Sequence, residues 1–140
     1  RKKQLGRYAS SIEKYCADRL SDAGISFAYE EREYTLCNSF KYNGLYYKMT
    51  QKKKELSNRS NSTVLPIKYT PDFCGTDKNF IVEVKGYLMS HHDFTMRWKL
   101  FLKYLSEVES DDLPALFIVK NKSQVDEMIE IIKTLPEWKM

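Results

Sequence analysis

Two neighbouring segments of this chain read as β-strands, yet both carry charged residues where strands usually hold apolar ones. The first segment, 63–73, ends in Tyr-Thr-Pro-Asp-Phe, and the second, 79–86, contains Phe-Ile-Val-Glu-Val-Lys-Gly. Strand interiors favour apolar and β-branched side chains. This pair of strands constrains the fold strongly, because it predicts a hairpin with Asp72, Glu83 and Lys85 built into it.

A hairpin that turns at Asp77-Lys78 would place Asp72 directly opposite Glu83. The Cβ atoms of such a pair lie about 4.5–5.5 Å apart, and two carboxylates that close repel each other unless a cation lies between them. Mg²⁺ and Mn²⁺ prefer carboxylate oxygens. Because side chains alternate along a strand, Lys85 shares a face with Glu83. It would orient or activate a water there, or stabilise charge that develops on a phosphoryl group.

The same three charges also have a purely structural interpretation. Lys85 would neutralise Glu83 on a solvated face, and Asp72 would cap a turn after Pro71. The surrounding segments favour the chemical interpretation, because Thr-Pro-Asp-Phe ends one strand and Phe-Ile-Val-Glu-Val-Lys-Gly forms a buried one.

The composition is that of a globular domain with a core of its own. The chain has 140 residues, of which 42% are hydrophobic and 14% aromatic, and this length predicts one domain. We find no apolar run near the roughly 20 residues that span a bilayer, and no signal-peptide core. Three widely spaced cysteines without a Cys-x-x-Cys pattern favour free thiols. We therefore expect a reducing, cytoplasmic setting and no membrane partner.

Positive charge is concentrated in two segments. The formal net charge is +4, with four cations and no acid in 1–7, and five cations and one acid in 48–59. An acidic stretch at 106–113 balances them. Such basic clusters fit a polyanionic partner such as nucleic acid, although lysine-rich loops are also well solvated without any partner.

Hydrophobic periodicity and turn residues predict alternating helices and strands. Ser10 and Gly24 bound the first helix, Asn43-Gly44 predicts a hairpin turn, and Ser123 caps the last helix. The predicted elements are a helix (10–24), a strand (25–36), a hairpin (40–49), a basic loop (50–62), two strands (63–73 and 79–86), a helix (93–107), a strand (113–120) and a helix (123–134). This order, α-β-β-β-α-β-α with an inserted hairpin and loop at 38–64, predicts an α/β (α+β) fold with a mixed central sheet flanked by helices.

The motif residues resemble the signature of the PD-(D/E)XK nuclease superfamily. Pro71-Asp72 matches its Pro-Asp element, and Glu83-Val84-Lys85 matches its Glu-x-Lys element. Within the superfamily, the chain is most similar to Holliday-junction resolvases of the phage T7 endonuclease I type. The similar segments are 10–31, 69–73 and 80–86, about a quarter of the chain. The pattern is also similar to other small phage nucleases and to transposon endonucleases of the TnsA type.

This resemblance implies a single nuclease domain over 1–140 with a restriction-endonuclease-like core. It implies an endonuclease that depends on Mg²⁺ or Mn²⁺ and hydrolyses the phosphodiesters of duplex or branched DNA, such as Holliday junctions. It also implies a homodimer that acts inside a phage-infected cell. Restriction-like, transposon-end and repair activities stay open, as does a nucleic-acid-binding module without catalysis. Residues 38–64 are longer than the connection that the resemblance leads us to expect.

The resemblance further implies which residues act. Those it assigns to catalysis are Asp72, Glu83, Lys85 and Glu13. Those it assigns to metal binding are Asp72, Glu83, Glu13 and the backbone carbonyl of Val84. Glu13 is matched by its position on the first helix, where it also has a structural interpretation, because Ser10-x-x-Glu13 is a capping box. The two roles are compatible.

Basic residues in three places are candidates for contact with nucleic acid. They are Lys2, Lys3 and Arg7 in the first segment, Lys52, Lys53 and Lys54 in the basic loop, and Arg97 and Lys99 on the helix 93–107. The first two groups would supply affinity for the backbone that does not depend on base sequence. His91 and His92 are interpreted as a solvated helix start or as metal or phosphate ligands. Tyr42, Tyr46 and Tyr47 fit either base stacking or an amphipathic hairpin.

Overall fold

The computed structural model describes residues 7–85 and 92–138, which divide into two compact units. The first, the sheet unit, contains the residues up to Glu33 together with those from Thr70 onward, and the second, the ribbon unit, is Tyr34–Tyr69. The predicted insertion at 38–64 lies inside the ribbon unit.

The sheet unit is built on a four-stranded mixed sheet. Its strands are β1 (Phe27–Tyr29), β8 (Phe73–Gly75), β9 (Phe80–Val84) and β10 (Ala115–Val119), side by side in that order. The pairs β1–β8 and β8–β9 are antiparallel, whereas β9 and β10 are parallel. The predicted combination of helices with a mixed sheet is thus confirmed.

The described residues form three helices, α2 (Ser11–Asp22), α3 (His92–Ser106) and α4 (Lys122–Lys133). The hydroxyl of Ser10 accepts a hydrogen bond from the backbone N–H of Glu13 at 3.1 Å, as predicted for an N-cap. Gly24, which follows the C-terminal end of α2, has a φ of +72°, a conformation that glycine adopts without strain. The predicted cap of α4 at Ser123 is wrong. Asn121 caps this helix by accepting a hydrogen bond from Gln124 N–H, because asparagine is an equally good cap two residues earlier.

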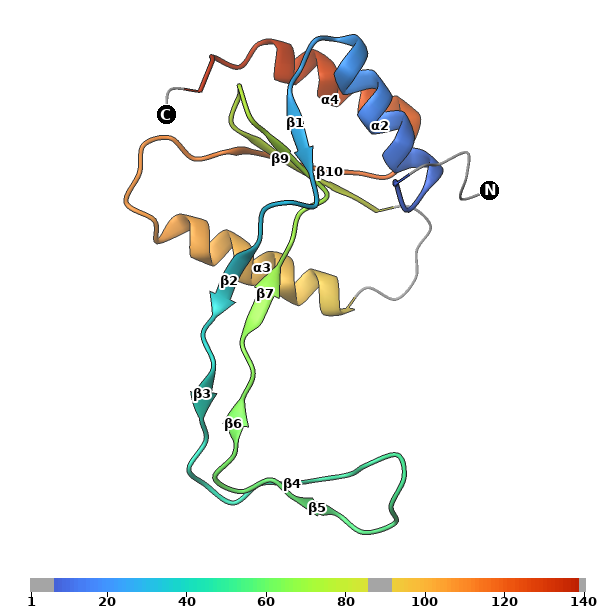
Figure 1. Ribbon diagram of the computed structural model, residues 1–140. Helices are drawn as coiled ribbons and strands as arrows, with labels where there is room; N and C mark the ends of the chain where they lie inside the picture. The colour runs from blue at the N-terminus through green and yellow to red at the C-terminus, as the bar shows by residue number, and fades with distance from the viewer. Residues whose placement is uncertain (1–6, 86–91, 139–140) are drawn as a thin grey trace. The chain divides into compact units, whose positions relative to one another are not determined.

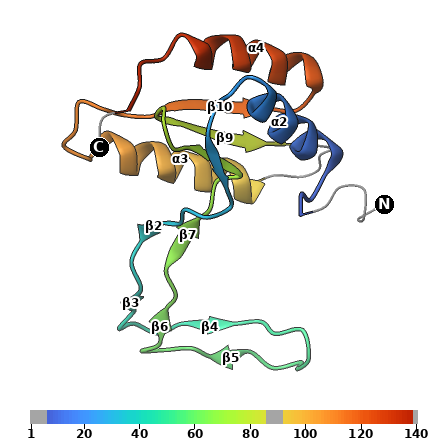
Figure 2. The same cartoon turned by 45° about the horizontal axis from the view of Figure 1, so that its top comes forward.

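The core of the sheet unit lies between one sheet face and the helix pair α2 and α4. Figures 1 and 2 show these two helices on one side of the sheet and α3 on the other. Leu20, Phe73, Val82 and Ile129 are fully buried members of one apolar cluster. At the margin of the helix pair, Arg19 Nε lies 2.9 Å from Asp126 Oδ1. The apolar stripes of α2 and α4 therefore face the sheet.

Both faces of β9 are covered. All five residues from Phe80 to Val84 are buried, and Glu83 is 8% exposed. Ile81 and Glu83 lie on the sheet face opposite to the apolar cluster that contains Val82. Phe101 of α3 is also fully buried and is not a member of that cluster. Burial on both faces explains why this strand is a continuous apolar run interrupted by a single acid.

The ribbon unit is one long antiparallel hairpin rather than a short one. Its pairs are β2 (Tyr34–Cys37) with β7 (Ile67–Tyr69), β3 (Phe40–Lys41) with β6 (Thr63–Val64), and β4 (Tyr47–Lys48) with β5 (Ser57–Asn58). The predicted hairpin turn at Asn43-Gly44 is therefore wrong. The strands on either side of Asn43-Gly44, β3 and β4, do not pair with each other but with β6 and β5. The Asn-Gly pair therefore lies at a bend in one arm of the hairpin.

Two predicted strands are also interrupted. The segment predicted at 25–36 divides into β1 and β2, and the one at 63–73 divides into β6 and β7, with β8 beginning at Phe73. Glu30, between β1 and β2, has a φ of 51°. A left-handed residue ends a strand because it turns the chain out of the extended conformation.

Within the described ranges, no helix has both the length and the apolar character to cross a membrane.

Candidate metal centre

Asp72 lies opposite Glu83, as the predicted turn required. In the β8–β9 pair, Phe73 faces Val82 and Cys74 faces Ile81, and one further step along this register brings Asp72 to Glu83. Two hydrogen bonds hold Asp72 in place. Its Oδ2 accepts from the backbone N–H of Val84 at 2.7 Å, and its carbonyl accepts from Glu30 N–H at 2.9 Å.

Three acidic side chains from separate elements converge beside this strand end. One carboxylate oxygen of each of Glu13, Glu30 and Asp72 lies within 4.8 Å of the other two. Glu13 comes from α2, Glu30 follows β1, and Asp72 precedes β8. Glu13 and Asp72 are among the residues predicted from the sequence, whereas Glu30 is not, since no pattern in the sequence distinguishes it from Glu31. Its position in a left-handed bend is the only local feature that marks it.

Glu13 is held on both oxygens by neighbouring hydroxyls. Tyr29 Oη donates to Glu13 Oε1 at 2.5 Å, and the hydroxyl of Ser10 donates to Glu13 Oε2 at 3.2 Å. The side chain is 8% exposed. Burial, followed by the hydrogen bond to Glu13, raises the pKa of Tyr29 well above its usual range. Tyr29 therefore stays protonated at neutral pH and keeps donating to Glu13.

The surroundings of Asp72 change the pKa of its carboxyl group. Burial, and then the negative charge of Glu83, raise the pKa of Asp72 to about 8, with further contributions from Glu13 and Glu30. The hydrogen bond from Val84 N–H acts in the opposite direction. A carboxyl group with such a pKa is partly protonated at neutral pH. A bound cation would favour the ionised form instead.

Glu83 and Lys85 form an ion pair next to this group. Lys85 Nζ lies 3.2 Å from Glu83 Oε2 and 3.9 Å from the ring centroid of Phe94 on α3. Glu83 is not a member of the close three-carboxylate group, although its charge acts on Asp72. The backbone N–H of Lys85 donates to Val119 O at 2.8 Å. Strand pairing thus fixes the backbone at Lys85. At Val84 the backbone N–H donates to Asp72 Oδ2.

The predicted nucleic-acid contacts lie in both units. Arg7 belongs to the sheet unit, where its guanidinium carbon is 5.5 Å from the ring centroids of Tyr8 and Tyr29. Arg97 and Lys99 are on α3. The lysines at 52–54 lie in the stretch between β4 and β5 of the ribbon unit. Lys2, Lys3 and His91 fall outside the described residues, and His92 is the first residue of α3.

This donor set fits a hard divalent cation. Carboxylate oxygens are the ligands that Mg²⁺ and Mn²⁺ prefer, and Asp72, Glu13 and Glu30 offer one each within a short distance. Burial, and then the negative charges of Asp72 and Glu13, raise the pKa of the Cys16 thiol to about 12. The hard cations that prefer carboxylate oxygens have little affinity for a thiol.

The chain was compared with models of protein families, with curated proteins and with solved structures, and none of these comparisons gave a match.

Proposed function

We propose that this chain is a metal-dependent endonuclease of the PD-(D/E)XK type that hydrolyses phosphodiesters of the DNA backbone, with Mg²⁺ or Mn²⁺ as its cofactor. The observation that carries the proposal is the position of Asp72. It is opposite Glu83, whose partner is Lys85, and within 4.8 Å of Glu13 and Glu30. A half-buried acid that lies among other acids and has a raised pKa is typical of a functional site.

Each residue has a distinct role in this proposal. Asp72, Glu83 and Glu13 would hold the cation, with Glu30 next to Glu13. When bound, the cation would polarise the phosphate and lower the pKa of an attacking water. Lys85 would keep a positive charge beside the reacting phosphate, where it stabilises the negative charge that develops in the transition state. The contacts to Phe94 and Glu83 limit the directions in which its amine can point.

Basic residues in both units support a DNA substrate. The ribbon unit carries seven cationic residues and one acidic residue. In the sheet unit, the guanidinium of Arg7 lies near the ring of Tyr29, whose hydroxyl donates to Glu13. Positive side chains bind the phosphate backbone without reading the base sequence. We further propose that the enzyme acts inside the cell as a homodimer on branched DNA, because two symmetric metal sites suit two opposed strands.

A second candidate function is nucleic-acid binding without catalysis. The Lys85–Glu83 ion pair fits this candidate as well as the first, since a purely structural ion pair would have the same geometry. The two candidates differ in what Asp72 does. A binding module has no use for a half-buried carboxylate held among other acids, whereas a metal-dependent nuclease requires carboxylates to hold its cation.

The deciding experiment is a cleavage assay with linear duplex, nicked duplex and four-way-junction DNA in Mg²⁺, Mn²⁺ or EDTA. We expect cleavage with either metal and none in EDTA or with Asp72→Asn. Asp77→Asn is the matched control, because Asp77 is an exposed aspartate of the same hairpin. Absence of metal-dependent cleavage on all three DNAs would leave only the binding module. Light scattering tests the dimer, and a monomeric mass with DNA bound would contradict it.

A further inference from the structure

The ribbon unit exposes large apolar side chains that its own strands do not cover. Phe40 is 50% exposed, Leu45 80% and Tyr46 40%. A two-stranded ribbon has too little structure to bury both of its faces. Apolar side chains gathered on an exposed surface mark a site of interaction, so this ribbon is expected to have a partner.

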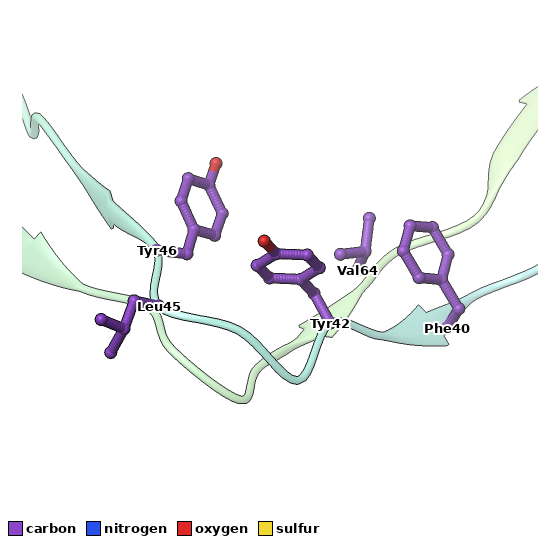
Figure 3. Close-up of a pocket in the computed structure, with 5 residues that line it drawn as sticks. All are labelled: Phe40, Tyr42, Leu45, Tyr46 and Val64. Carbon is purple, nitrogen blue, oxygen red and sulfur yellow. The ribbon is translucent and has the colours of Figure 1, made fainter.

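Part of this surface is a shallow apolar hollow. It has a volume of about 290 Å³ and is lined by Phe40, Tyr42, Leu45, Tyr46 and Val64. Figure 3 shows the side chains of Phe40, Tyr42, Tyr46 and Val64 on the same side of the ribbon. The rings of Tyr42 and Tyr46 are 6.3 Å apart at 90°. A planar ligand in this hollow would meet the face of one ring and the edge of the other.

The bend beneath the hollow is adapted to the ring of Tyr42. A Cβ atom at Gly44 would come within 2.7 Å of the Tyr42 hydroxyl oxygen. Glycine therefore lets the Tyr42 ring lie over the bend. After the bend, two hydrogen bonds join the two arms of the ribbon at Tyr46. The backbone N–H of Arg59 donates to Tyr46 O, and the backbone N–H of Tyr46 donates to Ser60 Oγ at 3.0 Å. The hollow is thus held by backbone contacts at Tyr46.

A second hollow of about 300 Å³ adjoins the first and shares Tyr46 and Val64 with it. Its lining is different, since it includes the cations Lys48 and Arg59 and the hydroxyl residues Ser62 and Thr63. Cationic and hydroxyl groups are the common partners of phosphate oxygens. An aromatic hollow beside a cationic one matches the two parts of a nucleotide, its base and its phosphate.

We propose that these two hollows form a binding site for an unpaired nucleotide of DNA, with the base against Tyr42 and Tyr46 and the phosphate near Lys48 and Arg59. This inference rests on the proposed function, which makes DNA the substrate, and adds that the ribbon selects DNA with unpaired bases. Bases within a duplex are already stacked and cannot enter. Aromatic side chains set among cations are the usual means of holding single strands.

The charge of the ribbon disfavours the other obvious occupant, a second copy of the same unit. Residues 34–69 contain seven cations, and Glu55 is the only acid. Two such units placed face to face would repel each other. A polyanion is attracted instead, so DNA fits the surface better than self-association.

The test measures binding in EDTA, where cleavage does not interfere. The probes are a duplex with a short single-stranded gap that contains 2-aminopurine, and the intact duplex of the same sequence. Stacking one base on an aromatic ring changes affinity by a factor of about 5 to 140. We therefore expect Tyr42→Leu to weaken binding to the gapped DNA by at least about 5-fold, with little change on intact duplex. The quenching of 2-aminopurine fluorescence on binding should be lost as well.

Two further variants make the result specific. Tyr47→Leu is the matched control, because Tyr47 is a 52% exposed tyrosine of the same ribbon and lines neither hollow. Tyr42→Phe keeps the ring and should bind gapped DNA like the wild type, which separates stacking from any loss of structure. The proposal is overturned if Tyr42→Leu binds both DNAs as the wild type does, or weakens both equally. A loss of dimer in Tyr42→Leu, with equal DNA binding, would identify a second copy as the occupant.

The result of this binding test does not depend on whether the protein cleaves DNA. The Asp72→Asn variant separates the two proposals, because it should lose cleavage and still bind the gapped DNA in EDTA as the wild type does. If Asp72→Asn cleaves normally, the proposed catalytic role fails, yet the fluorescence test of the ribbon still gives a result.

Discussion

The carboxylate of Asp72 accepts a hydrogen bond from the backbone N–H of Val84 at 2.7 Å. Through this contact, the acid that precedes β8 is attached to the strand that carries Glu83 and Lys85. Oδ2 is the carboxylate oxygen used in this way. Asp72 is therefore positioned by the backbone, and a cation need not hold it in place.

Asp72 is the residue whose replacement tests the candidate site most directly. We expect Asp72→Asn, Glu83→Gln and Lys85→Ala each to lower the cleavage rate by about 100-fold or more, because each removes a metal ligand or a charge that stabilises the transition state. Binding of DNA in EDTA should be retained. Gel-based cleavage and fluorescence anisotropy measure the two properties. A variant that cleaves at nearly the wild-type rate would remove its residue from the catalytic set.

The raised pKa of Asp72 predicts how the stability of the metal-free protein depends on pH. Between the ordinary value of 3.8 and about 8, the folded protein binds a proton that the unfolded chain has released. The free energy of unfolding therefore falls as pH rises through this window. Asp72→Asn should be more stable than the wild type by an amount that grows from pH 4 to pH 8, on the order of a few kcal/mol. Thermal unfolding in EDTA measures this difference, and a constant difference across the range would contradict the assigned pKa.

Glu13 has two roles that a pair of variants can separate. Glu13→Gln leaves the Ser10 cap in place and can still accept from Tyr29, so its stability should change little. Its cleavage rate should fall by about 10-fold or more if Glu13 holds the metal. Ser10→Ala removes the cap and should lower stability by about 1 kcal/mol while keeping most of the activity. Equal activity of Glu13→Gln and the wild type would reduce Glu13 to a structural residue.

Glu30 is expected to contribute to cation binding. Its carboxylate lies within 4.8 Å of those of Glu13 and Asp72, so Glu30→Gln should weaken Mn²⁺ binding by about 10-fold. Glu31→Gln is the control, since Glu31 is the neighbouring exposed acid outside this group. Isothermal titration with Mn²⁺ alone measures both variants. The same affinity in both would show that Glu30 is only a neighbour of the site.

The lysines at 52–54 should set affinity for DNA and leave the chemical step unchanged. Replacing all three with glutamine should weaken binding to every DNA sequence alike. The slope of log affinity against log salt should decrease by up to about 0.9 for each lost phosphate contact. A triple replacement of the exposed Lys120, Lys122 and Lys133 removes the same charge from the sheet unit and serves as control. An unchanged slope in the first variant would mean that these lysines do not contact the backbone.

Most of the local structure follows from short patterns. Ser10 as a cap and Gly24 as a stop delimit α2, and the apolar run at 113–120 contains β10. The register that sets Asp72 opposite Glu83 follows from a turn a few residues away. The errors occur where a local signal competes with distant pairing. Asn43-Gly44 is a favourable turn in isolation, but β3 and β4 pair with residues beyond 56.

By itself, the sequence determined the ends of α2, the β8–β9 hairpin and the shared face of Glu83 and Lys85, because each depends on residues within a few positions of one another. Only the tertiary structure decided that Glu30 joins Glu13 and Asp72, since packing brings together a helix, a bend and a strand end that are distant in the chain. It also decided that Tyr42 and Tyr46 line one hollow beside Lys48 and Arg59. Proximity between separate elements depends on how strands pair and cores pack, and no local pattern of residues contains that information.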